Sequence, residues 1–204
     1  MPDRDPLKPR KTPRQSRAAE TVAAILEAAA RILEKDGPAL YTTNRIAERA
    51  GVSIGSLYQY FPAKDAVTIA LIEREAALLR TDIEAARQET DWRTVLGRMI
   101  GAAVRHQLRR PALARVLDFE EARLPRQPES GQRLSAVHGA IVEALGRSPE
   151  LAGADRDRLA FDLQAMTRGI TDAAGERGET DAADLEARVA RAVFGYLGQP
   201  PATP

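Results

Sequence analysis

The sequence predicts an all-α protein, with an N-terminal three-helix domain that contains a helix-turn-helix and a larger helical domain after it. Three observations predict this. Ala, Leu, Arg and Glu dominate the 204 residues, and aromatic residues make up only 4%; alanine and straight-chain residues lose little freedom in a helix. Apolar residues recur at helical spacing, without the strict alternation of a strand. Capping residues and Gly or Pro breaks divide the chain into helix-length segments.

The first helix is predicted to begin at Thr12, which can cap it ahead of a proline, or a few residues later at Ser16. Gly37 and Pro38 are expected to end it. Its apolar face is formed by Val22, Ile25, Leu26, Ala29, Ile32 and Leu33.

Residues 42–61, TTNRIAERAGVSIGSLYQYF, predict two short helices at 44–50 and 54–61. Threonine or serine precedes each helix, where a hydroxyl can cap it. The three-residue turn between them starts with Gly51, which can take the positive φ that swings the second helix away from the first. Two short helices joined in this way form a helix-turn-helix.

The third helix is expected to expose a small, polar and aromatic surface without acidic groups, at Ile54, Gly55, Ser56, Tyr58, Gln59 and Tyr60. Such a surface suits a DNA major groove lined by phosphates. Charge agrees with this: the first 65 residues hold 11 basic and 8 acidic residues, and the remainder holds 19 and 21. The alternative is a helical hairpin without a role in DNA binding.

The rest of the chain is predicted to be helical throughout, without internal repeats. A Pro-rich loop is expected at 124–130 and a second loop at 148–153. The helices are expected near residues 63–88, 91–110, 111–123, 131–146, 155–176 and 181–197.

The run from Ile25 to Lys64 resembles the N-terminal domain of the TetR family, in the segments ILEAA, IAERAGVS and G-S-L-Y-x-Y-F-x-x-K. The resemblance covers about a fifth of the chain. It implies a ligand-responsive transcriptional regulator, normally a repressor, that binds palindromic double-stranded operator DNA as a homodimer and is released by a small molecule. The implied organisation is a disordered basic arm (1–11), a DNA-binding domain (12–63), a ligand-binding and dimerisation domain (64–198) and a mobile tail (199–204).

The resemblance also implies DNA contacts for seven residues. Hydroxyls, ammonium groups and backbone amides at helix starts are suitable donors to phosphate. Gln59 is the candidate for base reading, because its amide can bond adenine bidentately. For Tyr58 the alternative is core packing, and any contact of Ile54 would be apolar, for example with a thymine methyl group. The seven residues are Thr43, Gly55, Ser56, Tyr58, Gln59, Tyr60 and Lys64.

Apolar stripes run along the last two helices, and in the family these helices form a four-helix dimer bundle. The resemblance therefore implies a dimer interface that includes Leu163, Ile170, Val189, Val193 and Tyr196. The alternative is that the stripes complete only the core of the protomer.

An effector pocket is expected within the larger domain. Its candidate lining residues are Trp92, Met99, His106, Phe119, His138, Phe161 and Met166, and the alternative for each is an ordinary core or surface position. The two histidines lack acidic or cysteine partners at ligand spacing, so we expect no metal and no cofactor.

Other functional classes find less support. No Ser/His/Asp arrangement, phosphate loop or metal motif indicates an enzyme, so no catalytic residue is expected. A DNA-binding protein without an effector and an all-helical enzyme are the two alternatives. The absence of cysteine, of a signal-type segment and of an apolar stretch long enough for a bilayer predicts a cytoplasmic protein without a membrane partner.

Overall fold

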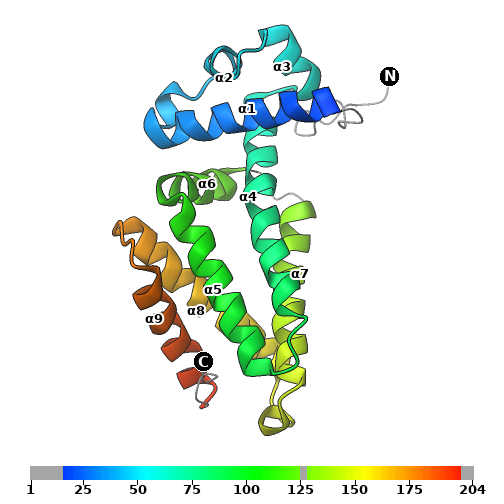
Figure 1. The fold of residues 1–204 in the computed structure, drawn as a ribbon, viewed down its shortest axis with the longest axis vertical. Helices are drawn as coiled ribbons and strands as arrows, with labels where there is room; N and C mark the ends of the chain where they lie inside the picture. The colour runs from blue at the N-terminus through cyan, green and yellow to red at the C-terminus, as the bar shows by residue number, and fades with distance from the viewer. Residues whose placement is uncertain (1–15, 125–127, 199–204) are drawn as a thin grey trace. The chain divides into compact units, whose positions relative to one another are not determined.

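A computed structural model of the chain describes residues 16–124 and 128–198, with side chains at 17–124 and 135–198. The expected basic arm, the alternative helix start at Thr12 and the C-terminal tail lie outside the described residues. Within these ranges every regular element is helical, as predicted (Figure 1). The elements are α1 (Ser16–Lys35), η1 (Pro38–Leu40), α2 (Thr43–Ala50), α3 (Ile54–Tyr60), α4 (Lys64–Ala86), α5 (Trp92–Arg109), α6 (Pro111–Arg123), α7 (Pro128–Gly146), η2 (Pro149–Leu151), α8 (Arg156–Glu176) and α9 (Ala182–Tyr196).

Local capping chemistry sets the start of the long helices α5, α8 and α9. Asp91 accepts a hydrogen bond from the Thr94 amide at 2.8 Å, and Asp155 and Asp181 cap α8 and α9 in the same way. The Thr94 hydroxyl and amide bonds hold the pKa of Asp91 below its ordinary value. Replacing such a cap with alanine typically costs about 1 kcal/mol. These three starts agree with the sequence prediction.

The prediction for α7 was wrong at its start. The helix begins at Pro128 rather than near residue 131, so residues 128–130 are helical and not part of a loop. Proline is favoured at the first helical position, because its fixed φ suits a helix and its missing N–H would have no partner there. The proline that was interpreted as a loop residue therefore stands where a helix starts.

The described residues form two compact units: one contains residues up to 75 together with 112–124, and the other contains 76–111 and 128–198. Helix α4 contributes its first turns to the first unit and its remaining turns to the second. The boundary between the DNA-binding and ligand-binding domains, expected between residues 63 and 64, stays a prediction. As packing units, Ala66, Val67 and Leu71 of α4 and Leu113 of α6 belong to the N-terminal core.

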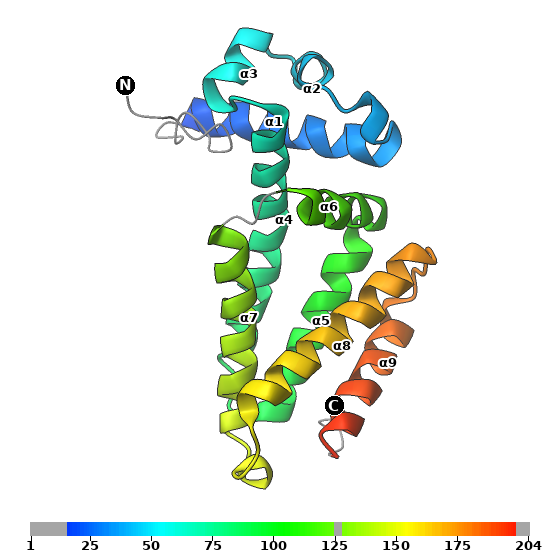
Figure 2. The ribbon, with the colours of Figure 1, turned by 180° about the vertical axis from the view of Figure 1, so that it is seen from behind.

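The first unit is built around α1. Helices α2 and α3 lie beside it (Figures 1 and 2), and its inward face is almost entirely buried. The core that these elements share includes Ile25, Ile32, Leu33, Tyr41, Ile46, Ala47, Leu57 and Phe61. Because Ile46 and Leu57 face α1, the opposite sides of α2 and α3 face outward.

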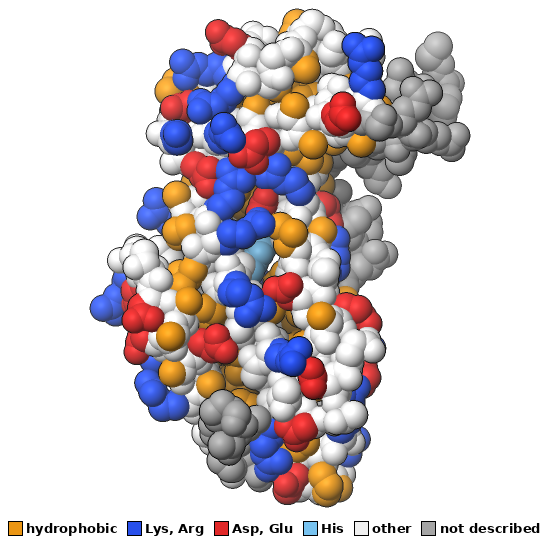
Figure 3. All heavy atoms as spheres, in the orientation of Figure 1, with side chains coloured by type: hydrophobic (Ala, Val, Ile, Leu, Met, Phe, Trp, Pro, Cys, Tyr) orange, Lys and Arg blue, Asp and Glu red, His pale blue; other side chains and the backbone are white. Residues whose placement is uncertain are grey.

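The second unit packs α5 against α7, α8 and α9, and Figure 2 shows α8 crossing α5. Its core includes Trp92, Leu96, Val104, Leu145, Leu163, Leu185, Val189, Val193 and Phe194. On the face drawn in Figure 3, basic and acidic side chains stand beside one another over this unit. One ion pair of the unit joins Arg105 to Asp82 at 3.1 Å.

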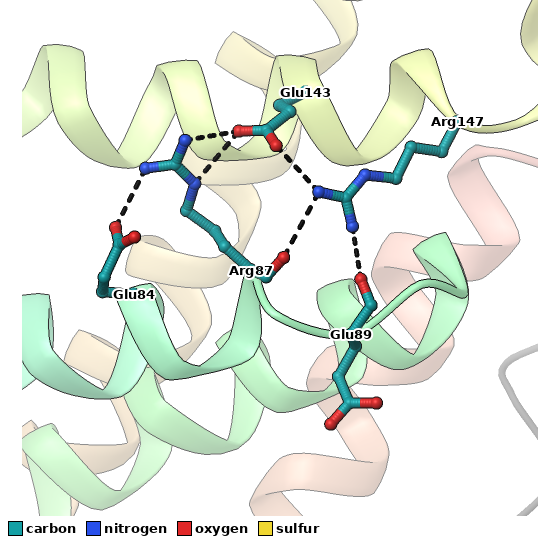
Figure 4. Close-up of polar contacts among 5 residues, drawn as sticks. All are labelled: Glu84, Arg87, Glu89, Glu143 and Arg147. Carbon is teal, nitrogen blue, oxygen red and sulfur yellow. Dashed lines mark hydrogen bonds and ion pairs between the residues drawn. The ribbon is translucent and has the colours of Figure 1, made fainter.

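Within the second unit, Arg147, the residue that follows α7, ties the turn between α4 and α5 to the end of α7 (Figure 4). Arg147 donates to the backbone carbonyls of Glu89 and Arg87, the latter at 3.2 Å, and pairs with Glu143 at 2.7 Å. The Arg87 side chain bonds the same Glu143 carboxylate. Bonds from Arg87, and then from Arg147, hold the pKa of Glu143 below its ordinary value. Arg147 therefore satisfies carbonyls that follow the end of α4.

Candidate nucleic-acid interface

The turn between α2 and α3 has the geometry that the sequence predicts. Thr42 is extended and its hydroxyl oxygen accepts from the Arg45 amide at 3.3 Å. Gly51 ends α2 in the left-handed region at φ 68°, where a residue with a side chain would be strained. Ser53 then caps α3 by accepting from the Ser56 amide at 3.0 Å. These local bonds fix the direction in which α3 leaves the turn.

The outward face of α3 presents an apolar, an aromatic and an amide side chain. Ile54, Tyr58 and Gln59 are exposed, whereas Leu57 is fully buried. Gly55 is also exposed, and a Cβ there would meet only the Ser53 hydroxyl, at 3.8 Å. Helix α3 carries no charged residue. No acidic side chain of α3 itself would therefore repel a phosphate backbone.

Two residues of this predicted surface are less available than expected. The Ser56 hydroxyl is half-buried and bonds the Ser53 hydroxyl at 2.9 Å. Tyr60 is half-buried and packs against the core that α1 shares with α2 and α3. Leu57 faces the core, and at about 100° per residue Ser56 and Tyr60 lie on the same side of it, about 100° and 60° away around the helix axis. Both therefore turn only partly outward.

A pair of hydroxyl groups joins α2 to α3 at the surface. The Thr43 Oγ1 and Tyr58 Oη atoms are 3.1 Å apart and hydrogen-bonded. Tyr58 is 39% exposed, so its ring is not a core residue. Each hydroxyl keeps hydrogen-bonding capacity beyond this bond. The pair can therefore meet an acceptor from outside while holding the two helices in register.

Lys64 begins α4 and lies against a ring that the sequence analysis did not single out. Its Nζ is 5.6 Å from the centroid of the Tyr41 ring. Tyr41 is almost fully buried, and burial raises the pKa of its phenol. Its hydroxyl bonds Thr68 of α4 at 3.1 Å. The contact joins residues far apart in sequence, and no local motif indicates it.

Arginine side chains on α2 also escaped the sequence reasoning. Arg45 and Arg49 are both exposed, and Arg49 pairs with Asp36 at 3.4 Å across the end of α1. Two basic residues on the polar face of α2 are a sequence pattern that indicates affinity for phosphate. Of the two, Arg45 is the residue whose amide Thr42 caps, and it follows Thr43 by two positions.

The expected pocket residues do not converge. Phe119 and Phe161 are 68% and 66% exposed, and Phe119 lies in the first unit rather than the second. Trp92 is buried, with its ring 6.3 Å from Phe194 and the Arg93 guanidinium 4.4 Å from the ring centroid. The sequence expectation was that these aromatic residues line one pocket. Apolar residue type alone does not fix which side of a helix faces the core, and so does not predict these placements.

The remaining expected pocket residues lie in the second unit. Met99 is buried in its core and Met166 packs against that core. His106 is half-buried, and His138 bonds Asp157 at 2.8 Å. Among the side chains described, no three His, Cys, Asp or Glu residues gather in a way that could hold a metal ion. The buried amide of Gln107 is an interior polar group that the sequence reasoning missed.

The predicted dimer residues need a correction. Leu163, Val189 and Val193 are at most 2% exposed, because they fill the core of their own protomer. Ile170 is half-buried against the same core. Of the five predicted residues, only Tyr196 is exposed. The burial of these three residues is what the alternative, that the stripes complete the protomer core, expects, and α5 packs against both α8 and α9.

No helix in the described part of the chain combines the length and apolarity that a membrane span requires. This finding concerns the described helices alone.

Two family models match the chain. Residues 25–71 match the bacterial regulatory proteins of the tetR family, and residues 91–197 match the tetracyclin repressor-like C-terminal domain. The second match alone spans more than half of the 204 residues.

Curated relatives match over part of the chain. The nucleoid occlusion factor SlmA of Actinobacillus pleuropneumoniae is 33% identical over 105 residues, which are 51% of this chain and 49% of SlmA. The HTH-type transcriptional repressor KstR of Mycobacterium tuberculosis is 28% identical over 131 residues, 62% of this chain and 60% of KstR. The chain spans about half the length of the first of these relatives.

Solved structures share the fold across most of the chain. SmeT, the repressor of the Stenotrophomonas maltophilia multidrug efflux pump SmeDEF, superposes with a TM-score of 0.67 at 23% identity, covering 88% of this chain and 91% of SmeT. The fatty acid degradation regulator FadR from Bacillus halodurans gives 0.71 at 18% identity, covering 85% and 97%. At these identities the likeness shows the fold alone. From the two family matches, the chain belongs to the tetR family of bacterial regulatory proteins.

Proposed function

We propose that this protein is a transcriptional repressor that binds double-stranded operator DNA as a homodimer and is released by a small molecule. The observation that carries DNA binding is the Thr43–Tyr58 hydroxyl pair, 3.1 Å apart, beside an outward face of α3 without charge. Membership of the tetR family supports the same proposal.

In this proposal α3 enters the major groove. The exposed Gln59 amide donates to N7 of an adenine and accepts from its N6 amino group. Ile54, exposed at the first turn of α3, contacts the methyl group of a thymine, the apolar feature of the major groove. Thr43, Tyr58 and Lys64 bind phosphate and set the register of the helix on the duplex.

A dimer follows from the small size of this surface. One short recognition helix makes few base contacts, and a two-fold dimer doubles them on a palindrome with half-sites roughly 34–36 Å apart. We place the pairing surface on the exposed sides of α8 and α9, where Phe161 and Tyr196 are 66% and 50% exposed. The Tyr196 hydroxyl donates to Asp162 at 2.5 Å, so the two helices present one continuous face. Exposed aromatic rings on such a face are typical of an interface.

The small molecule is proposed to bind in the second unit. SmeT has been solved in complex with triclosan, and that protein shares this fold. By analogy, an apolar effector would be met here by Trp92, Met99 and Met166, in or beside the core of the second unit. Binding must be reciprocal: operator DNA lowers effector affinity by the same factor by which effector lowers DNA affinity.

Selection from a random duplex library, followed by fluorescence anisotropy on the enriched sequence, tests DNA binding. We expect a palindromic site and an affinity that falls steeply with salt. Loss of either hydroxyl, in Thr43→Val or Tyr58→Phe, should weaken binding about fivefold, the equivalent of about 1 kcal/mol. In the double variant, the fold-loss of DNA affinity should be smaller than the product of the two single losses, because the hydroxyls share one hydrogen bond.

Thr81→Val makes the same chemical change as Thr43→Val at an exposed position of α4 in the second unit, and is the matched control, expected to bind DNA as the wild type does. Gln59→Ala should relax preference at particular bases, whereas Lys64→Ala should weaken all duplexes alike. Failure of the selection to enrich any sequence, with binding equal for all duplexes, would refute a sequence-specific regulator.

A second function, DNA binding without an effector, is favoured by one observation. Phe119 and Phe161 are exposed, and the Trp92 ring is already packed against Phe194, so the aromatic side chains do not line one interior surface. Titration of an apolar ligand library with and without operator DNA separates the two functions. Release of DNA by a ligand supports the first, and unchanged operator affinity across the library supports the second.

A further inference from the structure

Tyr41 is a buried tyrosine fixed at both ends. It follows η1, is 2% exposed and packs in the core of the first unit. Its hydroxyl is 3.1 Å from Thr68 Oγ1, and the Thr68 hydroxyl donates to the Lys64 carbonyl at 3.2 Å. A threonine hydroxyl has one hydrogen, so Tyr41 is the donor in the bond to Thr68. The ring is therefore held by apolar packing on its body and by α4 at its tip.

The face of this fixed ring meets the Lys64 ammonium. Nζ lies 5.6 Å from the ring centroid, within the range of about 6 Å over which a cation is attracted to an aromatic face. A lysine side chain is long and flexible, and it loses freedom when it binds an anion. The Tyr41 ring already restricts the ammonium before an anion binds. The lysine side chain therefore loses less conformational entropy when it binds the anion.

The acidic residue next to Lys64 is engaged elsewhere. Asp65 pairs with Arg123 of α6 at 2.8 Å, and Arg123 also bonds Glu120 at 2.8 Å. Arg123 thereby holds the nearest carboxylate of α4 in an ion pair of its own. Lys64 is also the first residue of a 23-residue helix, and the backbone dipole favours an anion at that end.

We propose that Tyr41 is a positioning residue for DNA binding: its ring holds the Lys64 ammonium in place to receive a backbone phosphate. The inference rests on the proposed function, since it concerns how one phosphate contact is prepared. Tyr41 itself does not touch DNA. Thr68 acts one step further back, by fixing the phenol.

A double-mutant cycle on the selected duplex tests this. Tyr41→Met keeps most of the volume but removes the aromatic face, and Tyr41→Phe keeps the face and removes the hydroxyl. We expect Tyr41→Met to weaken binding about two- to fivefold, as a partly exposed cation–π contact predicts, and Tyr41→Phe to bind almost as the wild type does. In a Lys64→Ala background, Tyr41→Met should cause no further loss. A purely structural role would produce the same loss in both backgrounds.

Proton NMR gives a second measurement that needs no DNA. The ring should shift the Lys64 ε-methylene protons upfield in the wild type and in Tyr41→Phe, and this shift should vanish in Tyr41→Met. An equal loss of affinity with and without Lys64, or no upfield shift in the wild type, would overturn the inference. If the wild type binds no duplex at all, the proposed function fails and the positioning role falls with it, whatever the NMR shift.

Discussion

Gly175 in α8 is a position where one added methyl group tests the packing of the second unit. A Cβ built there would lie 2.4 Å from Nε2 of Gln107 in α5, and 3.4 Å and 3.6 Å from its Cδ and Cγ. Gln107 is only 6% exposed, so its amide has little room to move into solvent. Gly175→Ala therefore forces α5 and α8 apart or drives Gln107 from its rotamer.

Two opposing effects give the magnitude. Alanine stabilises a helix over glycine by about 0.5–1 kcal/mol, whereas overpacking a core costs about 1–3 kcal/mol. Gly175→Ala should thus be destabilising by up to about 2.5 kcal/mol, because overpacking outweighs helix propensity. Gly139→Ala in α7 is the matched control: the position is exposed, with no atom within 4 Å of the added Cβ. It should be stabilising by the propensity gain alone.

Equilibrium unfolding in urea measures these differences, at one fixed protein concentration because the proposed dimerisation would change apparent stability. In a Gln107→Ala background the space opposite Gly175 opens, and Gly175→Ala should then be stabilising. The sign reversal is specific to this contact. Equal stabilisation by Gly175→Ala and Gly139→Ala in the wild-type background would refute the packing of Gln107 against α8.

Three further predictions concern other parts of the second unit. Arg147→Ala should lower the free energy of unfolding by about 1.5–3 kcal/mol, because it removes charged donors to two carbonyls after α4. Arg105→Ala, which removes an exposed ion pair with Asp82, should change urea unfolding little. Hydrogen bonds from the Ser148 hydroxyl, then from the backbone amide of Glu150 itself and from Arg93, lower the pKa of Glu150 from 4.5 to about 2, so the stabilisation by Glu150 holds above pH 4.5 and is lost as pH falls toward 2. The stability difference between wild type and Glu150→Gln should vanish over that range, and a constant difference would contradict the assignment. Phe161→Glu should yield folded monomers by light scattering while the equally exposed Phe119→Glu stays dimeric, and a Phe161→Glu dimer as tight as the wild type would exclude the proposed pairing face.

Local chemistry in the sequence was enough to predict the helices. Asp91, Asp155 and Asp181 each cap the amide three residues on, an interaction contained in four consecutive residues. Gly51 and Ser53 likewise determine the turn before α3. The candidate DNA-binding surface could be predicted for the same reason: its elements are short, adjacent in sequence and set by caps. Pro128 shows the limit, because proline occurs both in loops and at helix starts.

Partners far apart in sequence were decided only by the tertiary structure. An apolar stripe on α8 or α9 predicts that the stripe is buried, but not whether the protomer or its partner buries it. The structure assigns Leu163 and Val189 to the protomer core and leaves Phe161 exposed. The Tyr41–Lys64 contact depends equally on how α4 packs beside η1. Sequence periodicity records the side of a helix on which a residue lies, whereas its partner depends on the packing of elements distant along the chain.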